Sequence, residues 1–253
     1  MSEANGNKPE KKPREPKRAK DGFDFIRNGM DEYPAPTRAL YRFVAFVLGV
    51  FSRIVWPTSF EGLDDFVDHV RDHGSVLVMN HTSMVEPVVL ICELWRRGVH
   101  VRPIYKAEFE KIGPAKWLFR RVGGIPVDRG TADLKALKAA RDALMRGESV
   151  LIYPEGTRIK NDEQPVEIHG GFAMIAQMGK SDVVPSAVVG AADPYKTRPT
   201  RRRKPFVRFG APLTFDEVGG SVRKEKVANM EKAAMEQVYA LRDALREEHP
   251  GLW

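Results

Sequence analysis

A histidine and a carboxylate stand five residues apart in the segment 80–86, which reads Asn-His-Thr-Ser-Met-Val-Glu. It follows the apolar run 75–79, a pattern typical of a buried strand that ends in a loop. Residues five apart on one continuous helix point about 140° away from each other, so His81 and Glu86 can meet only if the chain turns between them. The carboxylate could then hold one imidazole nitrogen while the other faces a substrate, although the spacing alone is weak evidence for catalysis.

A second candidate site, the segment 153–158, also follows an apolar run and reads Tyr-Pro-Glu-Gly-Thr-Arg. Gly156 permits a close backbone approach, Thr157 offers a hydroxyl and Arg158 offers a forked cation. Exposed amides beside an arginine indicate an anion pocket that suits a phosphate. The alternative is a simple turn in which Glu155 and Arg158 pair with each other.

Positive charge also follows two further predicted strands. The segment 123–130 reads Gly-Gly-Ile-Pro-Val-Asp-Arg-Gly, and Lys106 ends the predicted strand before it. Lys106 and Arg129 would add positive charge at the same end of the sheet, or Asp128 and Arg129 could form a structural loop. A fourth segment, 183–189, is by itself only a buried strand with an early proline.

Helical and strand patterns alternate from residue 62 onward, which indicates an α/β fold with a largely parallel mixed sheet flanked by helices. Such sheets bind ligands at the carboxyl ends of their strands. The expected strands are 76–79, 101–105, 125–127, 150–153, 183–189 and 206–209, and the expected helices are 63–71, 85–97, 114–121, 132–145 and 171–178. A final amphipathic helix is expected over 222–246.

The N-terminal part has a different character. Residues 1–22 form a basic tail that we expect to be disordered, and residues 23–61 form a helical segment before the α/β domain of residues 62–253. The helix expected at 37–56 has an apolar centre flanked by Arg38, Arg42 and Arg53. Its uncharged core is shorter than the ~20 residues of a membrane span and fits a helix lying in the bilayer interface. A core helix and a single-pass span are the alternatives.

Composition narrows the function classes. The chain has 253 residues, a net charge of +7 and one cysteine, Cys92, which excludes an intramolecular disulfide and indicates a reducing compartment. We expect Cys92 to be buried, and we expect no metal site. Basic residues concentrate in 1–20 and 196–208, which suits an anionic membrane or nucleic acid, or simply a solvated surface.

Taken in order, the four segments resemble the glycerophospholipid acyltransferase family, which contains the 1-acylglycerol-3-phosphate acyltransferases. Its first block, Asn-His-x4-Asp, is matched at 80–86 with Glu86 in place of the aspartate, so the carboxylate arm is one methylene longer. Lys106 and residues 124–129 match the second block, residues 153–158 the third and Val184-Pro185 the fourth. The resemblance covers about residues 35–215.

The resemblance implies acyl transfer from a thioester to the free sn-2 hydroxyl of lysophosphatidic acid, which gives phosphatidic acid. His81 would act as the general base and Glu86 would orient it, while amides at the start of the following helix would stabilise the oxyanion. The implied phosphate-binding residues are Lys106, Arg129, Glu155, Gly156, Thr157 and Arg158.

No cofactor is implied apart from acyl-CoA or acyl-ACP as co-substrate. The implied partners are a lysophospholipid and an anionic membrane surface, without nucleic acid, and the implied location is the cytoplasmic face of the membrane, peripheral or monotopic. One alternative is the same chemistry on another acceptor: glycerol 3-phosphate, another lysophospholipid or a glycolipid. Another is non-enzymatic binding to an anionic membrane or nucleic acid.

Overall fold

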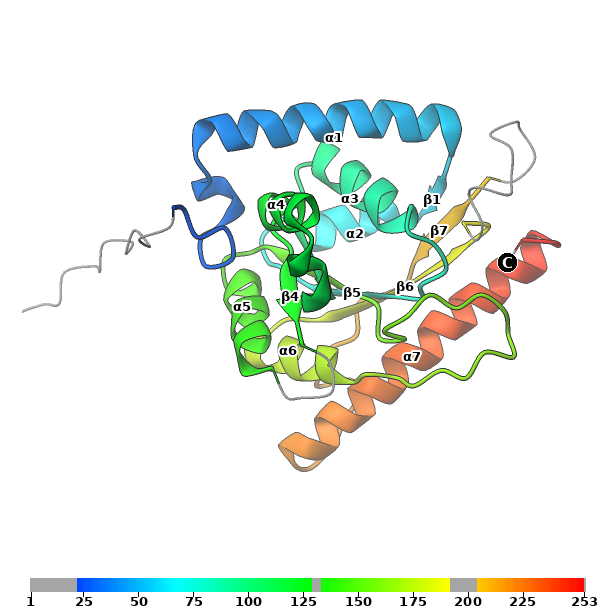
Figure 1. The fold of residues 1–253 in the computed structure, drawn as a ribbon. Coiled ribbons are helices and arrows are strands. Elements are labelled where there is room, and N and C mark those ends of the chain that lie inside the picture. Colours follow the sequence, from blue (N-terminus) through cyan, green and yellow to red (C-terminus); the bar gives the residue numbers. More distant parts are fainter. Residues whose placement is uncertain (1–21, 129–132, 192–203, 253) are drawn as a thin grey trace, which may run out of the picture.

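The computed structural model describes residues 22–128, 133–191 and 204–252, which form a seven-stranded sheet with helices on both faces (Figure 1). The sheet has the order β1-β7-β6-β2-β5-β3-β4, and every pairing among these strands is parallel except β6 with β7. This confirms the prediction of a largely parallel α/β fold. The strands are β1 (Ser59–Glu61), β2 (Val76–Met79), β3 (Val101–Lys106), β4 (Ile125–Val127), β5 (Ser149–Ile152), β6 (Val183–Val189) and β7 (Phe206–Phe209).

Two groups of helices cover the sheet because successive strand side chains point to opposite faces. The helices are α1 (Ala35–Val55), α2 (Leu63–His69), α3 (Glu86–Arg96), α4 (Gly113–Arg121), α5 (Leu134–Leu144), α6 (Gly171–Gly179) and α7 (Arg223–Glu248), with short 3₁₀ turns η1 (Met30–Glu32) and η2 (Ala107–Lys111). Val76 and Val78 of β2 pack under α5, α6 and α7, whereas Leu77 and Met79 pack under α2 and α3. The final amphipathic helix is confirmed, since Met230, Val238 and Leu245 of α7 are fully buried.

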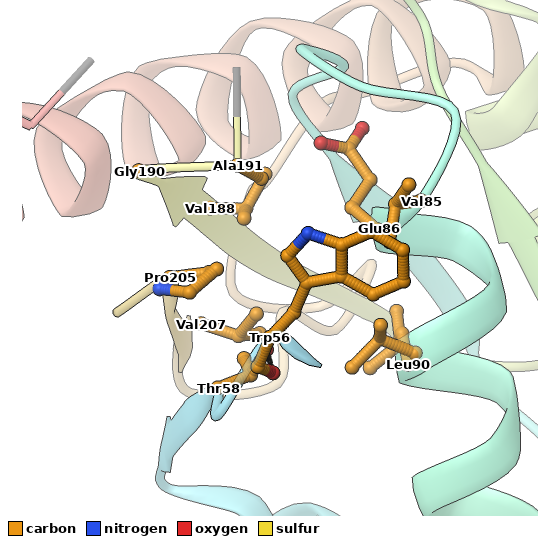
Figure 2. A pocket seen from close by; sticks show the side chains of 11 residues that line it. Trp56, Thr58, Val85, Glu86, Leu90, Val188, Gly190, Ala191, Pro205 and Val207 are labelled. Atoms are coloured by element: carbon orange, nitrogen blue, oxygen red, sulfur yellow. Dashed lines mark hydrogen bonds between the residues drawn. The ribbon is translucent and has the colours of Figure 1, made fainter. Parts of the chain in front are cut away.

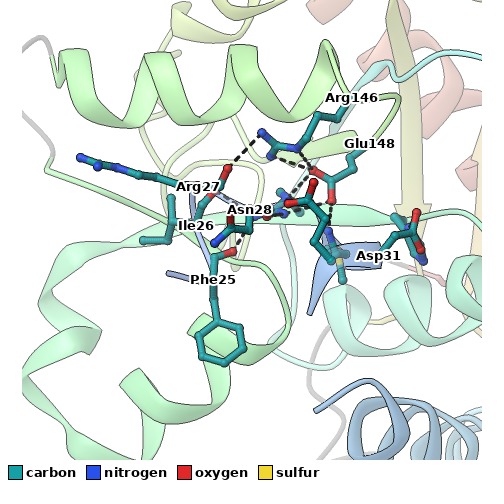
Figure 3. A network of polar contacts seen from close by, with 12 residues as sticks. Phe25, Ile26, Arg27, Asn28, Asp31, Arg146 and Glu148 are labelled. Carbon is teal, nitrogen blue, oxygen red and sulfur yellow. Dashed lines mark hydrogen bonds and ion pairs between the residues drawn. The ribbon is translucent and has the colours of Figure 1, made fainter. Parts of the chain in front are cut away.

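The N-terminal segment is joined to the domain at two places. β1 lies within the segment 23–61, yet it pairs with β7 and forms one edge of the sheet. The short strand pattern Ser-Phe-Glu was too brief to be recognised in the sequence. Farther upstream, the fully buried Arg102 binds the carbonyls of Phe25, Ile26 and Asn28, in the network of Figure 3. Residues 25–28 are therefore bound at the amino end of the sheet, and residues 59–61 form part of its edge.

Helix α1 crosses the outer side of α3 and exposes most of its apolar side chains (Figure 1). Phe43, Phe46 and Ile54 are 65%, 68% and 73% exposed, so α1 is not a core helix. Arg53 on its inner side binds Glu93 of α3 at 2.8 Å. Among the described residues, no helix is both long enough and apolar enough to cross a bilayer.

Two basic regions fall partly or wholly outside the described residues. The tail expected at 1–22 is described only at Gly22, and residues 196–203 of the basic stretch 196–208 are not described. Arg208 of that stretch lies in β7, where it binds the carboxylates of Glu61 and Glu248. Its charge is therefore used within the fold.

Cys92 lies on the buried side of α3, as expected from the apolar run around it. Burial raises the pKa of its thiol to about 11, and the neighbouring Glu93 adds to the increase. The thiol is therefore protonated at neutral pH, which fits a structural residue and not a nucleophile.

Candidate active site

The histidine of the first motif is placed by the residue before it. Asn80 is buried at the carboxyl end of β2, where its side-chain amide donates to the carbonyl of Val188 and its side-chain oxygen accepts from the Val188 N–H. These two bonds, 3.0 and 2.8 Å long, continue the pairing of β2 with β6 for one residue beyond the strand. The backbone of His81 is therefore held in place at the carboxyl end of the central strand β2.

Glu86 meets His81 as the spacing predicted. The chain turns after β2, and Oε1 of Glu86, in the first turn of α3, lies 2.5 Å from Nδ1 of His81. The side chain of Glu86 is 2% exposed, and it also accepts from the Thr82 N–H, the Thr82 hydroxyl and the Ser83 N–H. The longer arm of glutamate thus reaches the imidazole while its carboxylate is fixed by three further donors, which leaves Nε2 of His81 for a substrate.

Some amides near the start of α3 are already used within the turn. The N–H groups of Thr82 and Ser83, in the loop before the helix, donate to Glu86, and the N–H of Val85 donates to the hydroxyl of Ser83. The expectation that amides at the start of this helix face the oxyanion is therefore wrong for Val85, and it stays a prediction for the rest of the first turn. The physical reason is that the buried hydroxyl of Ser83 takes up the nearest donor of the helix.

The second motif holds His81 from the other side. Oε2 of Glu155 accepts the backbone N–H of His81 at 2.7 Å, and the carbonyl of His81 accepts the backbone N–H of Ile159 at 2.8 Å. Segment 155–159 is thus bonded to both backbone polar groups of the histidine. These bonds place the segment that contains the second motif directly against the backbone of His81. Glu155 turns toward His81 and away from the local pairing with Arg158 that was the alternative.

Two tyrosines complete the support around His81. The ring of Tyr153 stacks on the imidazole with centroids 4.3 Å apart, and the hydroxyl of Tyr239 in α7 donates to Oε1 of Glu155 at 3.3 Å. Burial raises the pKa of Glu155, and the nearby Glu86 raises it further, against the opposing effect of these hydrogen bonds. Burial also raises the pKa of Tyr239, to about 12. Tyr239 lies 84 residues from Glu155, so no local sequence pattern could indicate this contact.

The anion-binding residues are only partly arranged as expected. Gly156 has a positive φ of 63°, which glycine adopts readily, but its N–H donates to the carbonyl of Tyr153. The N–H of Thr157 similarly donates to the carbonyl of Glu155 at 2.7 Å. These two amides stabilise the turn and do not face outward as the exposed-amide interpretation required. The side chains of Thr157 and Arg158 are exposed.

The other two cations of the prediction follow neighbouring strands. Lys106 ends β3, which pairs with β5, the strand that leads into the segment 153–158. Because the two strands are parallel, Lys106 lies at the same end of the sheet as the loop that contains Arg158. Arg129 lies outside the described residues.

A mainly apolar pocket opens beside Glu86 and was not foreseen in the sequence. It is narrow and partly open to solvent. Figure 2 shows Trp56, from the end of α1, projecting into it below Glu86. Its apolar walls come from four parts of the chain, with Val89 and Leu90 from α3, Val188 from β6, Val207 from β7 and Pro205 before β7. Such a pocket suits an apolar ligand next to the His81–Glu86 pair.

Comparisons with known proteins agree with this arrangement. The family model described as Acyltransferase matches residues 60–189 of this chain. The 1-acyl-sn-glycerol-3-phosphate acyltransferase of Bacillus subtilis is 28% identical over 179 residues, which cover 69% of this chain and 84% of that protein. The enzyme of the same name from Streptococcus pneumoniae is 29% identical over 181 residues, which cover 70% of this chain and 64% of that protein.

The fold also matches a solved structure. The crystal structure of the 1-acyl-sn-glycerophosphate (LPA) acyltransferase PlsC from Thermotoga maritima aligns with a TM-score of 0.53 and 20% sequence identity. The alignment covers 84% of this chain and 85% of that chain. At this level of identity, the match supports the fold.

Proposed function

The chain belongs to the acyltransferase family, and we propose that it transfers a fatty acyl group from a thioester to the free sn-2 hydroxyl of lysophosphatidic acid, giving phosphatidic acid. The names of the Bacillus and Streptococcus relatives support this acceptor. The observation that carries the proposal is a pair of hydrogen bonds at the His81 backbone, whose N–H donates to the Glu155 carboxylate and whose carbonyl accepts the Ile159 N–H. They bring the loop that contains Arg158 against the base, so one substrate can present a phosphate to the loop and a hydroxyl to the imidazole.

In the proposed reaction, Nδ1–H of His81 donates to Glu86, which fixes the tautomer and leaves the Nε2 lone pair for the acceptor hydroxyl. Nε2 removes the hydroxyl proton as the oxygen attacks the thioester carbonyl carbon. The tetrahedral intermediate then collapses, the carbon–sulfur bond breaks, and the imidazolium returns the proton to the leaving thiolate. A positioned base of this kind contributes about 10²–10⁴ in rate.

The acceptor phosphate would bind to exposed side chains of the anion loop. Arg158 can form two parallel charge-assisted hydrogen bonds to phosphate oxygens, and Thr157 offers a hydroxyl beside it. Lys106 adds a point charge at the same edge of the sheet, and Arg129 remains a prediction for this site. Glu155 is buried and acts by holding the His81 amide, so its role in the proposal is to position the base.

The acyl donor would place its chain in the apolar pocket beside Glu86. The pocket adjoins the carboxylate that orients His81, so the carbonyl of a chain bound there would lie near the base. Trp56 lines this pocket and also follows directly on α1. The pocket is therefore continuous with the end of the exposed apolar helix, which supports entry of the chain from that side.

We further propose that α1 lies in the interface of an anionic membrane, on its cytoplasmic face, as a peripheral or monotopic attachment. Its exposed phenylalanines supply apolar area, and Arg42 is exposed beside them. Both substrates are amphipathic lipids or lipid thioesters, which supports work at a bilayer surface.

The test is a thiol-release assay with purified full-length protein, an acyl thioester and lysophosphatidic acid, followed by analysis of the acylated position. We expect thiol release that depends on the acceptor, with phosphatidic acid as product. Parallel reactions with acyl-CoA and acyl-ACP identify the donor, and reactions with glycerol 3-phosphate and with a neutral monoacylglycerol identify the acceptor. Turnover with glycerol 3-phosphate and none with lysophosphatidic acid would replace the proposed acceptor, and no turnover with any acceptor would overturn the activity.

A further inference from the structure

Two histidines and an aspartate meet at the amino end of the sheet, the end opposite to His81. His69 is the last residue of α2, His73 lies in the turn that follows, and Asp182 immediately precedes β6. Nε2 of His69 lies 3.3 Å from Oδ2 of Asp182, and Nε2 of His73 lies 3.9 Å from the same oxygen. One ligand atom from each residue falls within 4.8 Å of the others.

The separations of the two histidine nitrogens from Asp182 are close to those in a metal site. Two ligands of a tetrahedral zinc ion, with bonds of about 2.0–2.1 Å, lie about 3.4 Å apart. The His69–Asp182 separation already matches, and the His73 separation is only slightly larger. Since the side chain of His73 is 49% exposed, a small rotation of its ring can close the difference.

The ring nitrogen Nε2 of His69 contacts a carboxylate but makes no hydrogen bond among the described residues. Nε2 of His69 is buried and has no hydrogen-bond partner among the described residues, although Asp182 is only 3.3 Å away. Buried polar atoms are nearly always hydrogen-bonded or bound to a metal or water. A cation between the nitrogen and the carboxylate would satisfy both atoms at once.

The backbone around the cluster is held in place independently of the three side chains. Gly74 lies so close to β5 that a Cβ there would be 2.1 Å from the carbonyl oxygen of Glu148. The N–H of Ser75 donates to the hydroxyl of Ser149, and the carbonyl of Asp182 accepts the N–H of Val76 at 3.0 Å. The turn that carries His73 is thus fixed against the strand that carries Asp182, which reduces the cost of assembling a site.

A second group of possible metal ligands differs because an arginine already binds its carboxylates. Glu61, Glu248 and His249 also place ligand atoms within 4.8 Å of one another. There, however, the guanidinium of Arg208 already binds both carboxylates. In the described part of the chain, by contrast, Asp182 forms ion pairs only with His69 and His73, and with no lysine or arginine. The charge of the two histidines depends on their protonation.

We propose that His69, His73 and Asp182 bind a divalent transition-metal ion of the zinc type, with water as the fourth ligand. Two imidazoles and one carboxylate are a ligand set that Zn²⁺ takes readily. The ion would join the end of α2 to the start of β6 and so act on stability, because His81 lies at the other end of β2. This differs from the expectation of no metal site, since the third ligand is 109 positions beyond His73 in the chain.

The experiment is calorimetric titration of tag-free, chelator-treated full-length protein with ZnCl₂, together with thermal unfolding. We expect one zinc ion per chain, and at 100 times the dissociation constant a rise in Tm of about 5–10 °C. His73→Ala should weaken zinc binding at least about tenfold, because even loss of an outer hydrogen-bond partner of a ligand costs that much. Its metal-free Tm should stay close to that of the unchanged protein, since the ring is half-exposed.

Asp182→Asn provides a second variant of similar shape, and it should also lose zinc binding. The matched control is His100→Ala, which removes a histidine that lies 3.6 Å from Asp31 but belongs to no three-ligand group among the described residues. The control should bind zinc normally. Equal zinc affinity in His73→Ala and the unchanged protein would overturn the proposal, as would a site lost only in His81→Ala or an absence of binding up to 100 μM zinc.

Discussion

At the amino end of the sheet Arg102 is fully buried against Glu148, and at the carboxyl end His81 is held against the buried Glu86. The two pairs have similar short contacts, 2.9 Å for Nε of Arg102 and 2.5 Å for Nδ1 of His81. They differ in how many hydrogen-bonding atoms of the basic side chain remain without a protein partner. The guanidinium of Arg102 makes five hydrogen bonds, to Glu148 and to three carbonyls of the N-terminal segment, which equals its full number of donors.

His81 has a different balance. Its Nδ1, its N–H and its carbonyl are all occupied, by Glu86, Glu155 and Ile159, whereas Nε2 is the ring nitrogen that remains for a substrate. A buried charged pair therefore indicates function only when one of its groups keeps a hydrogen-bonding atom that a substrate can reach. Where every donor is used internally, as for Arg102, the pair fixes the position of one segment against another.

The largest effect should come from removing the base. His81→Ala should lower kcat at least about 100-fold, because a positioned general base contributes about 10²–10⁴ in rate. Steady-state kinetics with saturating acceptor measure the change, and circular dichroism verifies that the variant is folded. The control is His169→Ala, an exposed histidine that should leave kcat unchanged. Near-normal turnover of His81→Ala would contradict the assignment of the base.

The opposite end of the sheet should respond in stability. Glu148→Gln leaves Arg102 buried without its charge partner, and such a loss costs about 3–5 kcal/mol of unfolding free energy. Chemical denaturation measures this cost. The control is Glu236→Gln, whose partner Lys232 is exposed and 3.9 Å away, with an expected change of under about 1 kcal/mol. A Glu148→Gln protein of normal stability would refute the structural role of the pair.

The same glutamate predicts a dependence on pH. Burial alone would raise the pKa of Glu148, but Arg102, the Met30 N–H and Arg146 together lower it below the ordinary value of 4.5. A carboxyl whose pKa is lower in the folded state stabilises the fold above its unfolded pKa and loses this effect as pH falls through the folded value. Stability should therefore decline below about pH 4.5, and less steeply in Glu148→Gln, in acid-denaturation curves.

A smaller effect is expected from the anion loop. Arg158→Ala should raise the KM for lysophosphatidic acid about tenfold or more while kcat changes little, because charge-assisted hydrogen bonds contribute about 1.5–3 kcal/mol each. Lys160→Ala, an exposed cation two residues further on, is the control and should leave KM unchanged. An Arg158→Ala enzyme that loses kcat at constant KM would show that the arginine does not bind the acceptor in the ground state.

The smallest effect should appear at the exposed face of α1. Replacing Phe43, Phe46 and Leu48 together by serine removes apolar area from a surface that contacts little else. We expect the partition coefficient onto anionic liposomes to fall at least about tenfold in co-sedimentation, with soluble-substrate turnover preserved. The control replaces the exposed Leu134 and Met145 near α5, on the other side of the sheet, and should partition normally. Unchanged co-sedimentation of the triple variant would refute the attachment.

Local sequence patterns determined the elements of this protein to a large extent. Strands β2, β4, β6 and β7 have the predicted boundaries, and the His81–Glu86 contact follows from a strand that ends in a turn before a helix. These features depend on apolar periodicity and on residues close in sequence, so short-range physics decides them. The four ordered motifs similarly sufficed to indicate the family.

Only the tertiary structure decided how those elements cooperate. The bond from Glu155 to the His81 amide, the support of Glu155 by Tyr239 and the pocket between Trp56 and Pro205 join residues far apart in the chain. Such contacts form only when strands and helices from distant parts of the chain pack closely against one another. Local sequence patterns do not determine this packing, because it depends on the whole fold.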